Sequence, residues 1–274
     1  MIKSLLTKSV NLVPWSLRSH IKRIPVVKQI QQAIVNRLLN NAEFDHTINA
    51  GPAKGLKYPI VLPQDKLLWT GTWESEFAEI LAEKIKPGDV CFDIGSHRGF
   101  IAGIMAMSGA KEVHCFEPNP ENVGQIKKVV SLNPDHKFQI HECAVSDENG
   151  NATFTVMSES SMGQLNNSTF EGGADSMHSF DVTTKRLDSL ISESKIAGPS
   201  LVKIDVEGAE VAVLNGAVET IEKHHPVLCI EFHTKDLLRA IIEYVEQRDY
   251  KHELIEWSKL EEVPEDGIGH IIAF

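Results

Sequence analysis

Four ionisable side chains lie at the ends of two apolar segments that have the composition of buried strands. Asp205 and Glu207 follow one segment, and Glu231 and His233 follow the other. Neighbouring parallel strands bring their carboxyl ends to the same edge of a sheet, so we expect the four side chains to lie together. Carboxylates and an imidazole in one place can remove a proton from a bound acceptor or hold a divalent cation.

His233 is the preferred general base of this group, because the pKa of a free imidazole lies near neutral pH. Nearby carboxylates would raise that pKa by favouring the imidazolium. Two alternatives remain open: His233 could be a surface residue at the start of the next helix, and Asp205 and Glu207 could be charges favoured by a helix dipole. A divalent ion on Asp205, Glu231 and His233 is possible but is not expected.

A glycine pattern marks a second place where chemistry is expected. Asp93, Gly95 and Gly99 form an Asp-x-Gly-x-x-x-Gly pattern where an apolar strand meets a helix. Glycines there let the backbone approach a ligand, and the helix start offers free N–H donors. Glu117 follows the next strand, 22 residues after Gly95, where an acidic side chain can bind a ribose diol.

The spacing of the glycines separates two kinds of nucleotide ligand. A dinucleotide fold uses Gly-x-Gly-x-x-Gly to bring a helix start to a pyrophosphate. Here the residues after Gly95 are Ser96, His97 and Arg98, so the second glycine of that pattern is missing. The wider turn suits a nucleoside whose other end is an amino acid.

The remaining pattern predicts an α/β domain with a mostly parallel sheet between two layers of helices, because apolar strand segments alternate with amphipathic helices. The expected strands are 90–94, 113–117, 138–144, 201–206 and 227–232, with closing strands at 253–255 and 270–274. The expected helices are 74–85, 100–107, 120–132, 209–223 and 235–247. Segments 153–156 and 179–184 alternate like a hairpin, and 158–176 between them is either a mobile loop over the site or an ordinary connection.

Several of these motifs together resemble the FkbM family of S-adenosylmethionine-dependent methyltransferases. The motifs are Asp93-Ile94-Gly95 with Gly99, Glu117-Pro118-Asn119-Pro120, and Lys203-Ile204-Asp205-Val206-Glu207-Gly208-Ala209-Glu210, and the similarity covers roughly residues 71–233. The resemblance implies a three-layer, Rossmann-like class I methyltransferase fold with seven strands, the last one antiparallel. It also implies O-methylation of a hydroxyl on a sugar or natural product.

The resemblance further implies which residues bind S-adenosylmethionine. Asp93, Gly95 and Gly99 would line its methionine end, Glu117 its ribose, Cys143 and Ala144 its adenine, and Glu74 its amino group, with Asp205 beside it. Ser96 and His97 depart from the family, which commonly has Ala-Asn there. We keep Ser96 among the expected cofactor residues. The sequence does not show which residue makes the cofactor contact that the family's Asn usually makes.

Composition sets the broader limits. The chain has 274 residues, 42% hydrophobic and 24% charged, which suits a folded protein with a sizeable core. The net charge of −11 disfavours general binding to nucleic acid. Four cysteines without a Cys-x-x-Cys pair are expected to be reduced core thiols.

The N-terminal segment differs from the rest of the chain, because residues 1–40 carry seven basic side chains and no acidic one. The sequence predicts a helical basic extension over 1–48, a connecting hairpin and helix over 49–88, and the methyltransferase domain over 89–274. The extension either contacts an anionic membrane or, as we prefer, packs as a helical layer on the domain or on a second subunit. No apolar run is long enough for a spanning helix and no cleavage site is convincing, so a cytoplasmic, possibly membrane-peripheral protein is expected.

The sequence therefore predicts an S-adenosylmethionine-dependent O-methyltransferase with a small-molecule or carbohydrate acceptor, and possibly a homo-oligomer. One rival is an NAD(P)-dependent oxidoreductase on a similar sheet, which needs the narrower glycine turn. The other rival is a non-catalytic protein that keeps the nucleoside pocket. The acceptor, the methylated position, the metal requirement and the oligomeric state do not follow from the sequence.

Overall fold

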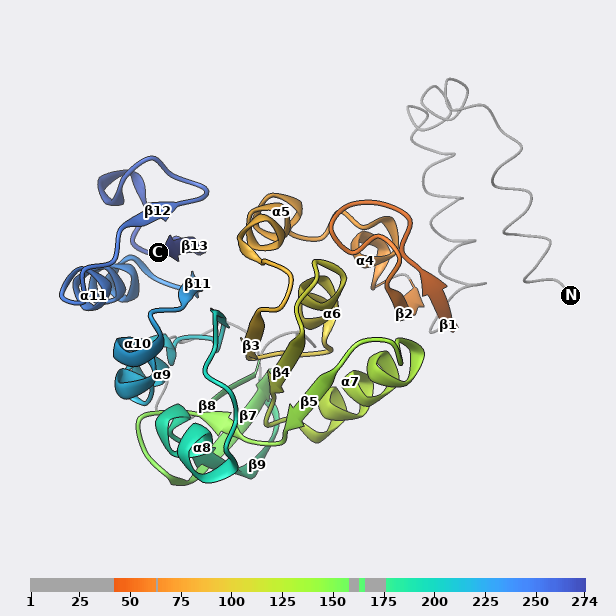
Figure 1. The fold of residues 1–274 in the computed structure, drawn as a ribbon, viewed down its shortest axis with the longest axis horizontal. Helices are drawn as coiled ribbons and strands as arrows, with labels where there is room; N and C mark the ends of the chain where they lie inside the picture. The colour runs from red at the N-terminus through yellow and green to blue at the C-terminus, as the bar shows by residue number, and fades with distance from the viewer. Residues whose placement is uncertain (1–41, 63, 158–162, 166–175) are drawn as a thin grey trace, which may run out of the picture. The chain divides into compact units, whose positions relative to one another are not determined.

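The computed structural model describes residues 42–62, 64–157, 163–165 and 176–274 (Figure 1). The chain divides into two compact units, one comprising Met1–Phe44 and Ile60–Lys66 and the other comprising Asp45–Pro59 and Leu67–Phe274. The site lies in the second unit. No helix within these described ranges is long and apolar enough to cross a bilayer.

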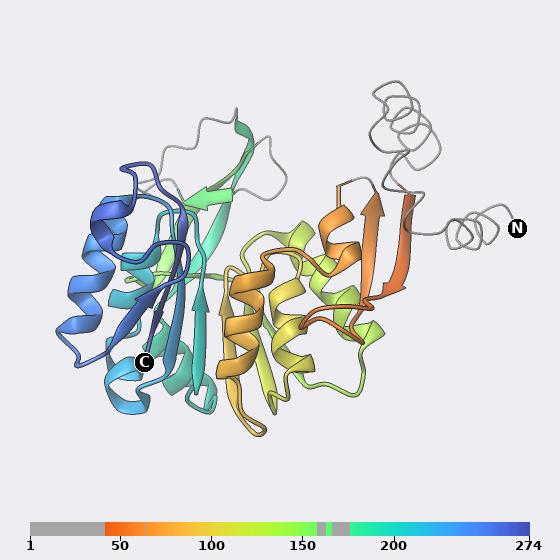
Figure 2. The same ribbon diagram turned by 90° about the horizontal axis from the view of Figure 1, so that it is seen from above.

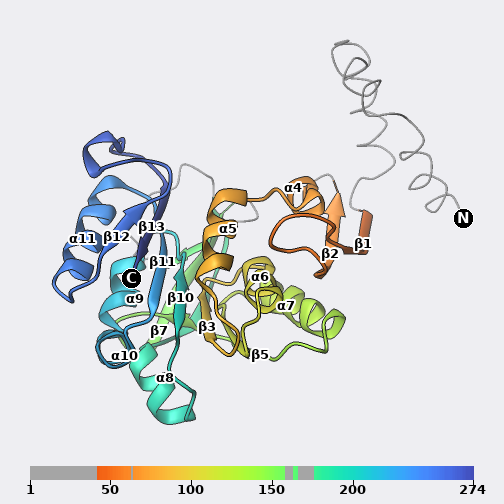
Figure 3. The same cartoon turned by 45° about the horizontal axis from the view of Figure 1, so that its top comes forward.

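A seven-stranded mixed sheet forms the centre of the second unit. Its strands are β3 (Val90–Ile94), β4 (Glu112–Phe116), β5 (Phe138–His141), β10 (Leu201–Ile204), β11 (Val227–Phe232), β12 (His252–Leu254) and β13 (Gly269–Ala273). Their order is β12-β13-β11-β10-β3-β4-β5, and several lie side by side in Figure 3. β13 runs antiparallel to both neighbours, which confirms the predicted class I methyltransferase topology.

Helices cover both faces of this sheet, as Figure 2 shows. One group comprises α5 (Ser75–Lys84), α6 (Phe100–Met107) and α7 (Pro120–Leu132). The other comprises α8 (Leu187–Ser194), α9 (Glu210–Asn215), α10 (Val218–His224) and α11 (Lys235–Glu246). Short elements α4 (Lys66–Thr70) and η1 (Leu260–Glu262) complete the helical segments described. The central strands are buried on both sides, which explains their continuous apolar sequence.

Strand alternation collects the charged residues of the sheet on one of its two faces. Lys203 pairs in register with Asp93 and Cys229, and Glu231 pairs with His270. Because side chains alternate along a strand, residues in register or two apart share a face. This is the face on which α5 packs, since its Phe77 ring stacks on His270 at 4.1 Å between centroids.

A second, four-stranded sheet corrects the strand predicted at 138–144. β5 ends at His141, and Ala144–Val145 (β6) instead pairs with β9 (Ser176–Lys185). β9 also pairs antiparallel with β7 (Gly150–Met157), which confirms the predicted hairpin, and β8 (Gly163–Leu165) pairs with β7. The rest of the predicted loop 158–176 lies outside the described residues.

The helix predicted over 209–223 is interrupted. α9 ends at Asn215, and α10 starts at Val218. Gly216 sits between them, where a Cβ atom would come within 2.0 Å of the Ser146 carbonyl oxygen. The segment that contains Ser146 therefore packs against the helix at Gly216, where the lack of a side chain leaves room for it, and the helix is interrupted there.

The helical prediction for residues 1–48 is wrong at its end and untested elsewhere. Ala42–Thr47 forms strand β1, which pairs with β2 (Lys57–Leu62) in a two-stranded sheet. From Glu43 to Thr47 exposed and half-buried side chains alternate, which is the two-residue period of a strand. Residues 1–41, including the basic segment, lie outside the described residues.

Candidate active site

The glycine turn after β3 is closely packed. Gly95 has φ +74°, and a Cβ atom there would lie 1.7 Å from the Asp205 carbonyl oxygen, so only glycine fits. The amides of Gly95 and Ser96 both donate to the Phe116 carbonyl oxygen, at 3.0 and 3.1 Å. These bonds hold the turn against the end of β4, beside Glu117.

Glu117 is buried and holds the same turn from the side. Its Oε2 accepts a hydrogen bond from the His97 amide at 2.8 Å, and its Oε1 accepts one from the Asn119 amide at 2.9 Å. Burial raises the pKa of Glu117 to about 7, although these bonds and one from Asn122 act to lower it. The carboxyl group is therefore fixed in place.

A cavity opens at this edge of the sheet, and five of the expected cofactor residues line it. These five are Gly95, Glu117, Cys143, Ala144 and Asp205, and other lining residues include His97, Phe116, Phe154, Glu207 and Ala209. A cradle that a single Cβ would fill, next to a fixed carboxyl group, fits a ribonucleoside cofactor. The hairpin sheet contributes Phe154 to the lining, which the sequence did not predict.

The other four expected cofactor residues lie around the cavity rather than in its lining. Asp93 is fully buried, and the Ser96 hydroxyl donates to its carbonyl oxygen at 2.6 Å. Gly99, with φ +80°, caps the start of α6. Glu74 precedes α5, and burial raises its pKa, with charges at His270 and Asp205 also acting on it.

Lys203 is a buried cation of the site. Its Nζ lies 3.4 Å from Asp93 and 3.1 Å from Asp205, and it donates to the Gly95 carbonyl oxygen at 2.8 Å. Burial alone would lower the pKa of Lys203, but Asp205 and Asp93 raise it above its usual value. Lys203 is thus paired with two carboxylates, and it also joins β10 to the glycine turn.

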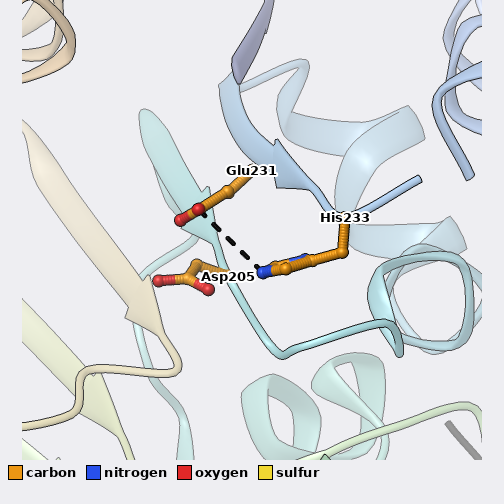
Figure 4. Close-up of side chains that lie close together, drawn as sticks. All are labelled: Asp205, Glu231 and His233. Atoms are coloured by element: carbon orange, nitrogen blue, oxygen red, sulfur yellow. Dashed lines mark ion pairs between the residues drawn. The ribbon is translucent and has the colours of Figure 1, made fainter. Parts of the chain in front are cut away.

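Asp205, Glu231 and His233 come together as expected for adjacent strand ends. One ligand atom from each lies within 4.8 Å of the others. Figure 4 shows the three side chains directed toward one another, with the ion pair between Glu231 Oε1 and His233 Nε2 at 3.9 Å. Glu207 joins this group, since its Oε2 lies 3.1 Å from the same Nε2.

His233 is buried rather than at the surface. Its Nδ1 lies 3.0 Å from Oε1 of Glu210, which in turn accepts a hydrogen bond from the Gly208 amide at 2.9 Å. Burial would lower the pKa of His233, but hydrogen bonds to Glu207 and Glu210 raise it to about 11. The imidazole therefore carries a proton at neutral pH in this state.

Burial and neighbouring charges also shift the pKa values of the carboxyl groups around His233. Burial raises the pKa of Glu231 to about 9, and the Asp205 charge adds to this rise. Burial also acts to raise the pKa of Asp205, but Lys203 and His233 lower it overall. Asp205 is thus the anion best supplied with positive neighbours.

Two residues of this network were not singled out from the sequence. Glu210 is fully buried against His233, although its place in the Asp-x-Glu-Gly-x-Glu motif was a usable signal. His270 approaches Glu231 Oε2 at 3.8 Å through its Nε2, and its Nδ1 lies 2.6 Å from Glu256. No sequence pattern links His270 to the site, because the contact depends on the antiparallel pairing of β13.

Comparison with known proteins identifies the family of the chain. The profile of the Methyltransferase FkbM domain matches residues 93–252, more than half of the chain. The hexuronic acid methyltransferase AglP of Haloferax volcanii is 27% identical over 174 residues, which span 62% of this chain and 68% of that protein. The 2-O-methyltransferase NoeI of Sinorhizobium fredii is 28% identical over 156 residues, which span 50% of this chain and 61% of that protein.

A solved structure is also similar. The methyltransferase FkbM of Methylobacillus flagellatus KT aligns over 93% of this chain and 61% of its own, with 16% identity and a TM-score of 0.47. The domain match begins at Asp93, near the end of β3, and includes Glu117 and the cluster around His233. The chain belongs to the FkbM methyltransferase family and is an S-adenosylmethionine-dependent methyltransferase.

Proposed function

We propose that this chain methylates a hydroxyl group of a carbohydrate or small natural product. The names of two relatives, a hexuronic acid methyltransferase and a 2-O-methyltransferase, support a sugar hydroxyl as the acceptor. The observation that carries the proposal is the position of Asp205, which lines the cavity and also belongs to the ionisable cluster. One residue thus connects the space for a nucleoside with groups that can take up a proton.

Within the cavity, S-adenosylmethionine would supply a methyl group activated by its sulfonium. We assign Glu117 to the ribose hydroxyls, and Cys143 and Ala144 to the edge of adenine, because all three line the cavity. Gly95 allows close approach of the backbone.

The residues around the cavity have a supporting part in this proposal. Asp93, Ser96 and Gly99 would shape the turn at the methionine end, since they lie beneath or beside it. Glu74 would hold the amino group of the cofactor, because it is an acidic residue close enough to the cluster for charges at His270 and Asp205 to act on its pKa.

For catalysis, the acceptor must be aligned and must lose its proton. We propose that Asp205, Glu207, Glu231 and His233 do this together. With a pKa of about 11, His233 can act as the base only after its own proton has moved to a neighbour. Glu207, 3.1 Å from His233 Nε2, is placed to take that proton.

Cofactor binding tests the assignment of Glu117. Calorimetry with S-adenosylhomocysteine should give binding to the wild-type chain, while NAD should give none. Glu117→Ala should weaken S-adenosylhomocysteine affinity by about 10–100-fold, as expected for the loss of hydrogen bonds to a charged acceptor. Glu121→Ala, at an exposed residue in the first turn of α7, is the matched control and should bind normally.

A transfer assay tests the reaction. Cofactor with a tritiated methyl group should label hydroxyl acceptors, with hexuronic acids and other hexoses tried first, and the label should appear as an O-methyl ether. Label on nitrogen or carbon acceptors alone would contradict the proposal. Binding of S-adenosylhomocysteine without transfer to any hydroxyl acceptor would favour the non-catalytic rival.

A further inference from the structure

We infer that Asp205, Glu231 and His233 bind a divalent transition-metal ion that holds hydroxyl groups of the acceptor. This inference rests on the proposed function and deepens it, because it states how the acceptor is held beside the cofactor. The residue types alone did not favour a metal. The arrangement of the side chains supplies what the sequence lacked, and Figure 4 shows the three side chains close together.

The distances suit a three-ligand site. Metal bonds to imidazole nitrogen and carboxylate oxygen are about 2.0–2.2 Å, so ligand atoms of one ion lie roughly 3–4 Å apart. His233 Nε2 and Glu231 Oε1 are 3.9 Å apart, and all three ligand atoms lie within 4.8 Å of one another. Small side-chain rotations would close the remaining gap once a cation offsets the repulsion between the carboxylates.

The contact with Glu210 prepares His233 for such a role. Metal-binding histidines generally donate their second ring N–H to a carboxylate or carbonyl, which fixes the tautomer. Here Nδ1 of His233 lies 3.0 Å from Oε1 of the fully buried Glu210, and the Gly208 amide holds the same oxygen. With the proton of Nδ1 directed at Glu210, a metal ion would displace the second proton, which Nε2 shares with Glu207 at 3.1 Å, and would take the Nε2 lone pair.

His270 provides an independent indication of a ligand at this point. Its side chain is 91% buried, and its Nε2 has no hydrogen-bond partner among the described residues. The nearest acid to that nitrogen is Glu231 Oε2 at 3.8 Å, which is too far for a hydrogen bond. A water or an acceptor hydroxyl bound to an ion at Glu231 is the kind of partner that would satisfy this buried nitrogen.

The network also holds more carboxyl groups than its basic side chains can pair with. Six carboxylates are linked through ion-pair distances to only three basic side chains. The carboxylates are those of Asp93, Asp205, Glu207, Glu210, Glu231 and Glu256, and the basic residues are Lys203, His233 and His270. Lys203 binds Oδ2 of Asp205, so the second oxygen of that carboxylate remains for an ion.

The ligand set indicates the class of ion and its use. One imidazole with two carboxylates favours a first-row divalent ion such as Mn²⁺, Co²⁺ or Zn²⁺ over Ca²⁺. Three protein ligands leave coordination positions open, as in catalytic metal sites. Neighbouring hydroxyls of an acceptor could fill them, and the ion would orient the acceptor and make its hydroxyl more acidic.

Metal binding without cofactor or acceptor is the direct test. The full chain, stripped with EDTA, is titrated with Mn²⁺, and free Mn²⁺ is followed by its electron paramagnetic resonance signal. We expect about one bound ion per chain, consistent with a single three-ligand site. Glu231→Gln and His233→Asn should each weaken Mn²⁺ binding by at least roughly tenfold, while Glu210→Gln, which keeps all ligands, should weaken it by about 10–100-fold.

A matched control and a second ion make the result specific. Glu246→Gln alters an exposed glutamate that lies 3.9 Å from His252, outside the cluster, and should bind Mn²⁺ normally. Co²⁺ should give a visible absorption band that His233→Asn changes. Circular dichroism checks that each variant is folded.

Two results would overturn the inference: no Mn²⁺ binding by the folded wild-type chain, or binding that Glu231→Gln and His233→Asn leave unchanged. S-adenosylhomocysteine calorimetry in EDTA separates this failure from failure of the proposed function. If the cofactor product still binds while Mn²⁺ does not, only the metal site is refuted.

Discussion

Replacing Lys203 by methionine should be one of the most destabilising single changes in the sheet. The side chain is 5% exposed, and its Nζ faces Asp93, which has no exposed surface, at 3.4 Å. Removing one partner of a buried ion pair costs about 3–5 kcal/mol, because the other charge is left without compensation. The variant also loses the hydrogen bond to the Gly95 carbonyl oxygen, which disconnects the glycine turn from β10.

Urea denaturation monitored by circular dichroism measures this cost. With a slope of about 3 kcal/mol/M for a chain of this size, the midpoint should fall by roughly 1–1.7 M. The control is Lys127→Met, which removes a shorter ion pair, 2.6 Å from Glu142, between side chains that are 58% and 56% exposed. That loss should cost less than about 1 kcal/mol, because solvent screens the pair.

The double variant and the pH dependence identify the cause. Adding Asp93→Asn to Lys203→Met removes the more deeply buried of the two carboxylates that lose Lys203, the other being Asp205, so stability should recover by about 2–3 kcal/mol relative to the single variant. Burial already raises the pKa of Asp93, and loss of Lys203 would raise it further. A raised carboxyl pKa destabilises the folded state as pH rises through it, so the deficit should shrink on acidification. A deficit below about 1 kcal/mol at neutral pH, or no recovery in the double variant, would refute the reasoning.

Three further predictions concern the turn, the ribose carboxylate and a helix start. Gly95→Ala should abolish S-adenosylhomocysteine binding and lower the melting temperature. The control is Gly88→Ala, because Gly88 has φ +100° and no atom lies within 4 Å of the position of a Cβ there. It should lower the free energy of unfolding by only about 1–2 kcal/mol and retain binding. As pH rises from 4.5 to about 7, Glu117→Gln should become more stable than the wild type by up to about 3 kcal/mol, because the raised pKa of Glu117 makes the wild-type fold less stable over that range. Urea titrations across this pH range measure the difference in stability, and a difference that does not change with pH would contradict the raised pKa. Asp188→Ala should cost about 1–2 kcal/mol in thermal unfolding, since it removes three hydrogen bonds at the start of α10, and an unchanged melting temperature would exclude this capping role.

The sheet and its functional edge were predictable because both follow from local patterns. Continuous apolar segments separated by helices require a parallel sheet, and in a parallel sheet all strand ends meet at one edge. That rule alone predicts Asp205 and Glu231 near each other, as they are in the structure. The antiparallel last strand came from the family resemblance rather than from periodicity.

Interruptions of regular elements were not predictable, because they depend on contacts between distant segments. Gly216 reads as an ordinary residue of a helix until Ser146 is found against it. The end of β5 at His141 depends on Ala144 pairing with another sheet. By contrast, α8 has a local signal in the helical spacing of Leu187 and Leu190, although it is not among the helices predicted above.

The second layer of the site was beyond sequence reasoning for the same reason. His233 was expected as a base or a surface residue, but its burial against Glu210 decides its protonation and direction. His270 lies 37 residues further along the chain and reaches Glu231 only because β13 pairs with β11. The positions of strand ends in the sequence predict which residues lie close together. They do not predict which of these residues orient the others through hydrogen bonds.

Three of the six non-glycine residues with positive φ among the described residues lie near this edge of the sheet. Glu74, His97 and Glu207 all have positive φ angles, between +43° and +52°, although none is a glycine. Such backbone strain costs about 1–3 kcal/mol per residue and persists only where the surrounding structure holds it. Here it coincides with an excess of carboxylates over basic groups, which a fold selected for stability alone would avoid. A cationic ligand at this edge would offset that excess and so stabilise the folded chain by mass action.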